Sequence, residues 1–144
     1  MPAGWCSFTL PGRRSLRSLW RCIQHSPGFR VLAVALERHV SAEASGIMRG
    51  PFSLAGEEEL RTVIAGAGFR EITIRSKTGT VRFPSAARLV QDYAAGSPLA
   101  GHVAKISDEA RAALVKEVGE ALQSYVVGGA LAFPIDAHLA SAKK

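Results

Sequence analysis

The fold is decided by two stretches of alternating side chains, REITIRS (residues 70–76) and ALAFPIDAHLAS (residues 130–141). In the first, Ile72 and Ile74 alternate with polar residues. In the second, every odd-numbered residue from Leu131 to Leu139 is apolar. A period of two is typical of a β-strand with one buried face. We therefore predict two strands of one sheet, paired antiparallel.

Two positions in these segments do not suit a regular ladder. Lys77-Thr78-Gly79-Thr80 interrupts the first alternation before Val81 and Phe83 resume it, and the glycine favours a bulge or a bend. Pro134 has no N–H group to donate, so it fits an edge position or a local bulge.

Helical patterns surround the strands. Ser26 and Pro27 suit the N-cap and first position of a helix that continues to about Val40. Further helices are predicted after Glu57, after Pro84 and after Ser107, and a weaker strand pattern covers residues 14–20. The order strand, two helices, strand, two helices, strand indicates an α/β domain with a small sheet.

Size and composition suit one compact domain. The chain has 144 residues, of which 47% are hydrophobic. No apolar run approaches the ~20 residues that span a bilayer, so no membrane segment is expected. The two cysteines are too few for a disulfide framework, and a reducing cytoplasm suits them. We therefore expect a cytoplasmic protein.

The net charge of +6 lies near the amino terminus. Five arginines precede the first acidic residue, Glu37, and the other 13 of the 18 basic residues nearly balance the 12 acidic ones. Residues 1–25 are also poorly patterned. They carry no nucleic-acid-binding signature, so a nucleic-acid partner is not expected. We interpret residues 1–25 as a basic segment set apart from a domain over residues 26–144.

Short motifs follow one another in a set order along the chain. They are Pro11-Gly12-Arg13, Pro27-Gly28-Phe29, Leu36-Glu37-Arg38-His39-Val40, Ala65-Gly66-Ala67-Gly68-Phe69-Arg70, Thr78-Gly79-Thr80-Val81-Arg82-Phe83-Pro84-Ser85, Gly96-Ser97-Pro98-Leu99-Ala100-Gly101 and Ala132-Phe133-Pro134. In their joint order, and best from Ser26 to Lys144, the chain resembles the C-terminal half of a class I S-adenosylmethionine-dependent methyltransferase.

The resemblance implies a partial methyltransferase-like sheet. It places the family's fifth strand after Pro11-Gly12-Arg13, followed by a helix and a sixth strand. The family's seventh strand is antiparallel and inserted between the fifth and the sixth. Residues 84–127 would be a helical insert that covers the acceptor substrate, with Tyr93, His102 and Tyr125 as its substrate-binding residues.

The family's cofactor-binding features have no counterpart in this sequence. In the family, the first strand ends in an acidic-x-Gly-x-Gly-x-Gly loop, and an acid of the second strand binds the cofactor ribose. Gly66-Ala67-Gly68 follows a helix and precedes a strand, whereas a nucleotide loop needs a strand, then glycines, then a helix. The pattern fits a helix C-terminus instead. We therefore expect a truncated, methyltransferase-related domain that neither binds S-adenosylmethionine nor transfers methyl groups alone.

Cys22 and His25 offer an alternative chemistry. A thiol activated by an imidazole is the nucleophile of some hydrolases, and Arg21 would favour the thiolate. The sequence indicates no third group to orient the histidine. The four histidines lack metal-ligand spacing, so no metal site is expected. Asp136 and His138 share one side of the last strand, which we interpret as a solvated face.

A third function is that of a partner-binding module, which would complement a separate N-terminal half. Without that half, a strand edge and apolar faces would be open, and such surfaces favour association. We therefore expect a homodimer or higher oligomer, formed by domain swapping or by direct contact. Its interface is predicted in residues 12–40, including Trp20, Phe29 and Leu32.

Overall fold

The computed structural model describes residues 6–10, 14–53 and 56–144. The chain forms two compact units. Unit 1 comprises Met1–His25, Gly50–Gly79 and Ile135–Lys144, and unit 2 comprises Ser26–Arg49 and Thr80–Pro134. The strands β3 (Arg70–Phe83) and β5 (Ala130–Lys143) contribute residues to both units. None of the described helices is long and apolar enough to cross a membrane.

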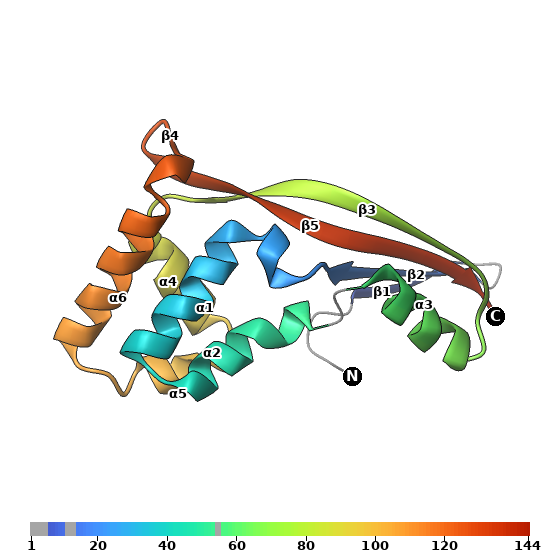
Figure 1. Ribbon diagram of the computed structural model, residues 1–144, viewed down its shortest axis with the longest axis horizontal. Coiled ribbons are helices and arrows are strands. Elements are labelled where there is room, and N and C mark those ends of the chain that lie inside the picture. Colours follow the sequence, from blue (N-terminus) through green and yellow to red (C-terminus); the bar gives the residue numbers. More distant parts are fainter. Residues whose placement is uncertain (1–5, 11–13, 54–55) are drawn as a thin grey trace. The chain divides into compact units, whose positions relative to one another are not determined.

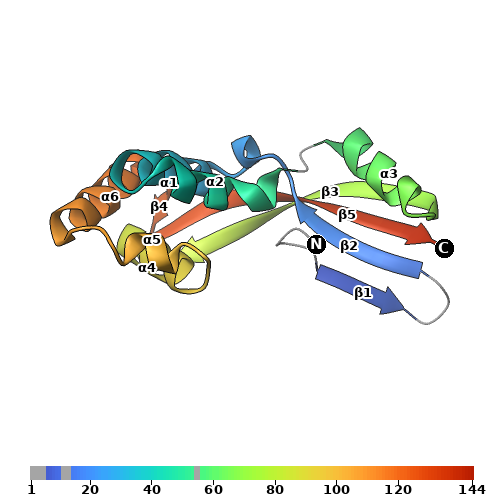
Figure 2. The same cartoon turned by 90° about the horizontal axis from the view of Figure 1, so that it is seen from below.

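Unit 1 is built on a sheet with the strand order β1-β2-β5-β3 (Figure 2). The strand β1 is Cys6–Leu10 and β2 is Arg14–Trp20. β2 is antiparallel to both β1 and β5. β5 and β3 are also neighbours and run in opposite directions (Figure 1). The prediction of an α/β fold with an antiparallel pair over residues 70–76 and 130–141 is therefore confirmed, as is the weak strand over residues 14–20.

One face of this sheet is covered by α3 (Glu57–Gly66). The buried side chains that form this core are Leu19, Leu60, Ile64, Ala140 and Ala142. Three glutamates occupy the first turn of the helix, where they complement the positive end of its dipole. Gly68 follows the helix with a φ of +84°, a conformation that favours glycine. Gly66-Ala67-Gly68 is therefore a helix C-terminus, as predicted.

The buried side of β5 changes along the strand. Leu131, Phe133 and Ile135 are buried, but farther along the buried residues are His138, Ala140 and Ala142. Side chains alternate between the two faces of a strand, so odd-numbered residues are buried in one part and even-numbered residues in the other. The predicted odd-numbered core therefore holds only up to Ile135, and the interpretation of His138 as solvated is wrong.

Gly79 in β3 and Pro134 in β5 are the two positions that do not suit a regular ladder. β3 continues through Gly79 as one strand from Arg70 to Phe83, and its partly buried residues change from Ile72 and Ile74 before the glycine to Val81 and Phe83 after it. A left-handed conformation occurs at Glu71 near the start of the strand, with a φ of 49°. The β2 partner of β5 covers only Ala137–Lys143. Pro134 lies outside that range, so its missing N–H costs no hydrogen bond to β2, as an edge position requires.

Unit 2 is mainly helical. Its elements, apart from the parts of β3 and β5, are α1 (Pro27–His39), α2 (Ala42–Arg49), α4 (Ala86–Ala95), α5 (Ala100–Val103), α6 (Asp108–Ala121), the 3₁₀ turn η3 (Gln123–Tyr125) and the short strand β4 (Val126–Val127). α1 packs against α2 and α6, and α4 packs against α6. The unit 1 segments add two 3₁₀ turns, η1 (Ile23–His25) and η2 (Gly50–Phe52).

Serines directly precede four of these helices, and the hydroxyl of Ser41, before α2, accepts a hydrogen bond from the backbone N–H of Ala44. The side chains of Ser85 and Ser107 accept hydrogen bonds from the backbone N–H groups of Arg88 and Ala110, so both act as caps. Ser26 occupies the N-cap position of α1 with Pro27 after it, but its side chain makes no capping bond. The predicted role of Pro27 is confirmed, whereas that of the Ser26 hydroxyl is not.

Two residues of the predicted oligomer interface are inaccessible. Phe29 and Leu32 of α1 are buried within unit 2. A surface contact through these two side chains is therefore ruled out, because they fill the core of their own unit. Trp20 is exposed. The edge of β2 that the prediction left open is paired with β1.

Candidate functional site

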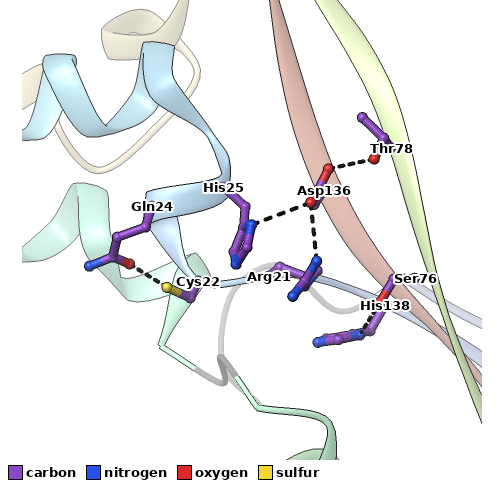
Figure 3. Close-up of polar contacts among 8 residues, drawn as sticks. All are labelled: Arg21, Cys22, Gln24, His25, Ser76, Thr78, Asp136 and His138. Carbon is purple, nitrogen blue, oxygen red and sulfur yellow. Dashed lines mark hydrogen bonds and ion pairs between the residues drawn. The ribbon is translucent and has the colours of Figure 1, made fainter.

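A cluster of polar side chains in unit 1 surrounds the carboxylate of Asp136 on β5 (Figure 3). Arg21 Nη1 donates to Oδ2 at 3.2 Å, and Thr78 Oγ1 donates to Oδ1 at 2.7 Å. His25 Nδ1 lies 3.5 Å from Oδ2. The side chain of Asp136 is only 16% exposed, so these partners replace much of the water that its charge would otherwise require.

Backbone geometry at the end of β2 brings these groups together. The N–H of Arg21 donates to the carbonyl oxygen of Asp136 at 2.9 Å, directly after the last residue of the strand. The chain then turns through η1, where the N–H of His25 donates to the Cys22 carbonyl at 2.9 Å. Ile23 is buried in this turn and anchors it. His25 is thereby returned toward β5.

The predicted nucleophile pair is split between two sets of contacts. The thiol of Cys22 donates to Gln24 Oε1, whereas the ring of His25 faces Asp136 (Figure 3). Within the described part of the chain, no hydrogen bond joins the Cys22 thiol to the His25 ring. The carboxylate of Asp136 therefore lies next to the His25 ring, a neighbour that the sequence did not reveal. The side chain of His25 is 44% exposed, so a bound group can reach its ring.

His138 belongs to the covered face of the sheet beside this cluster. Its side chain is 2% exposed, and its Nδ1 lies 3.3 Å from Ser76 Oγ. The predicted solvated face of Asp136 and His138 is therefore a largely buried one. The carboxylate of Asp136 contacts Arg21, His25 and Thr78. His138 contacts Ser76 instead.

The three substrate-binding residues implied by the resemblance lie on different elements of unit 2. Tyr93 is on α4, where its ring centroid is 5.2 Å from that of Phe29 and burial raises the pKa of its hydroxyl. His102 is on α5 and Tyr125 is in η3. Over residues 15–53 and 56–144, no hydrogen bond or ring contact joins these three side chains to one another.

The described loops lack the strand–glycine–helix order that the resemblance implies for an S-adenosylmethionine site. The connection from β3 to α4 is Pro84-Ser85, without a glycine, and the glycines at 66 and 68 lie between a helix and a strand. The described residues thus offer no strand–glycine–helix loop for the cofactor. They also hold no group of three or more metal-ligating side chains.

Comparisons with known proteins add no relative. No protein-family model matches the chain, and no curated protein matches its sequence.

Part of the Asp136 cluster was not predicted. The sequence places Thr78 in an interruption of the strand and links Arg21 only to the thiol of Cys22. The one usable signal is the pair of polar residues Asp136 and His138 among the even-numbered residues of β5, which becomes informative once Asp136 is known to lie beside β2 and β3.

Proposed function

We propose that this chain is the acceptor-substrate half of a methyltransferase fold and does not bind S-adenosylmethionine on its own. The observation that carries the proposal is the strand order. The last strand, β5, lies between β2 and β3 and runs antiparallel to both. This is the arrangement that the resemblance implies for the family's seventh strand between its fifth and sixth.

The order of helices supports the same assignment. α1, α2 and α3 separate β2 from β3, while α4, α5 and α6 separate β3 from β5. Residues 84–127 are therefore mostly helical, as an insert that covers an acceptor would be. Under this proposal Tyr93, His102 and Tyr125 contact the acceptor, and the cofactor-binding strands come from a different segment of polypeptide.

Calorimetric titration with S-adenosylmethionine tests the proposal. The chain alone is expected to give no saturable heat, because no glycine loop is present to hold the cofactor. Mixing the chain with a separately expressed methyltransferase half that carries the glycine loop is expected to produce a stable complex. A stoichiometric micromolar isotherm for the chain alone would refute the proposal.

A thiol-dependent hydrolase is the second candidate, favoured by the contact between His25 and Asp136. In this reading Cys22 is the nucleophile, His25 the base and Asp136 the orienting acid. Hydrolysis of an activated ester should then fall on Cys22→Ala, His25→Ala and Asp136→Asn. Cys6→Ala, which removes the only other cysteine, is the matched control. Activity that survives both the Cys22 and His25 replacements would eliminate this candidate.

A further inference from the structure

The sheet of unit 1 has a second face, opposite α3. Strand pairing places Leu16 beside Ser141, Ser18 beside Leu139 and Trp20 beside Ala137. Paired residues of neighbouring strands lie on the same face, and alternate residues lie on the other. Leu16, Trp20 and Leu139 therefore share the face that α3 does not cover. They are 41%, 38% and 40% exposed.

Two cations of β3 belong to this face as well. Ser76 and Thr78 bond to His138 and Asp136 on the side of the sheet that faces α3. Alternation along β3 puts Arg75 and Lys77 on the opposite side, next to Leu139 and Ala137. Both are exposed, and neither forms an ion pair with a described residue.

Lys143 and Glu71 also lie on this face, but together they do not change its net positive charge. Lys143 lies on the same side of β5 as Leu139, and its Nζ is 2.5 Å from the carboxylate of Glu71. That pair is neutral, so Arg75 and Lys77 supply two cations without a matching acid among the described residues. Asp136 belongs to the other face of the sheet.

We propose that this face, defined by Leu16, Trp20, Leu139, Arg75 and Lys77, binds an acidic amphipathic helix of a partner protein. Leu16 and Trp20 are four residues apart on β2, about 13 Å, and Leu139 lies midway between them on the next strand. About two turns of a helix, ~11 Å, present an apolar stripe of that length. The cations on β3 border the stripe on one side, where they favour carboxylates in the partner.

A second copy of the chain fits this face less well. A symmetric contact would bring Arg75 and Lys77 of both copies into one interface, and the only acid on this face that the structure describes, Glu71, already pairs with Lys143. Like charges brought together in an interface oppose association. Trp20 is the only aromatic side chain among the five residues that define the face, and one ring between two leucines is a poor platform for successive nucleic-acid bases, which stack on several aromatic rings. The surface therefore favours a protein partner, whatever the outcome for the proposed function.

The probe is a synthetic 18-residue helical peptide with leucines at every third or fourth position and glutamates along one side of that stripe. Two matched peptides replace either the glutamates with lysines or the leucines with serines. Trp5→Phe makes Trp20 the sole tryptophan of the chain, so its fluorescence reports binding at the proposed face. We expect saturable binding of the acidic peptide that weakens as salt is added.

Charge reversal of the face provides the decisive comparison. Arg75→Glu combined with Lys77→Glu should weaken the acidic peptide about tenfold and strengthen the lysine peptide. Leu139→Glu should weaken the acidic peptide, and Lys116→Glu on α6 is the exposed control that should not affect it. The dichroism spectrum of each variant verifies its fold.

Several results would overturn this proposal. They are an absence of saturable binding, equal binding of the serine peptide, or tighter binding of single-stranded oligouridylate at the same face. A concentration-dependent dimer that Leu139→Glu abolishes would assign the face to a second copy instead.

Discussion

Glu117 on α6 connects that helix to the end of α1 in unit 2. Arg38 Nη1 donates to its Oε1 at 2.8 Å, and His39 Nε2 lies 2.6 Å from its Oε2. The hydrogen bond from His39, followed by the charges of Arg38 and His39, lowers the pKa of the Glu117 carboxyl, while burial opposes that shift. A carboxylate whose pKa is lower in the folded state than in the unfolded state stabilises the fold above its unfolded pKa.

This contact predicts an acid-sensitive contribution to stability. Glu117→Gln should lower the free energy of unfolding by about 0.5–1 kcal/mol at pH 7. The difference from the unchanged chain should shrink as the pH falls below about 4.3, the ordinary value for glutamate, because the native carboxylate is then neutralised as well. Urea unfolding of the variant and of the unchanged chain at pH 7 and at pH 3 measures the difference in their free energy of unfolding at each pH.

Glu120→Gln is the control for this comparison. Glu120 is exposed, and its carboxylate lies 3.9 Å from Lys116 Nζ, so its replacement should have little effect at either pH. A gap for Glu117→Gln that stays equal at the two pH values would show that the carboxylate charge is not what stabilises the contact.

At the scale of elements, the start of α1 lies close to the β5 segment of unit 2. A Cβ added to Gly28 would lie 2.3 Å from the ring of Phe133, far inside van der Waals contact. Phe133 is buried, with Phe29 at right angles to it at 5.5 Å and Phe83 stacked at 6.4 Å. The glycine thus permits the helix to approach a ring that its neighbours hold in place.

Gly28→Ala should therefore destabilise unit 2. Overpacking of this kind costs about 1–3 kcal/mol, since the ring or the helix must move. Gly46→Ala on α2 is the matched control, because open space surrounds that glycine and alanine favours helix by ~1 kcal/mol. Thermal unfolding should show the first variant melting lower and the second slightly higher. Equal melting temperatures would contradict the close packing at Gly28.

At the scale of the whole molecule, β1 changes the expectation for assembly. The predicted homodimer rested on an open strand edge as well as on apolar faces, and the edge of β2 is paired with β1 over five residues. The edge of the sheet on this side is therefore β1, which is only five residues long, and a short edge strand offers few backbone groups for pairing with another copy. We therefore expect the chain to be a monomer in dilute solution, with a mass near 15.3 kDa by light scattering after size exclusion.

Removal of residues 1–10 tests the role of β1 directly. The deletion exposes the N–H and carbonyl groups of β2, so association should increase with concentration. A full chain that elutes at twice its monomer mass would restore the original expectation of a dimer. A deleted chain that remains monomeric would show that β1 is not what protects this edge.

The sequence by itself determined the local elements. Alternation at Ile72 and Ile74 and from Leu131 to Ile135 specified the strands, Ser85 and Ser107 marked helix starts, and Gly68 marked a helix end. Each of these signals acts over a few residues, through side-chain direction, capping or a left-handed backbone. They are therefore readable without knowledge of what packs against them.

Only the tertiary structure decided which faces are buried and which polar groups meet. His138 is buried because α3 covers the even-numbered side of β5 in unit 1, while unit 2 buries the odd-numbered side. Arg21 and Asp136 are 115 residues apart in sequence. They meet because β5 lies next to β2, and no local pattern encodes that strand order, since the pairing of distant strands depends on how the whole chain buries its apolar surface.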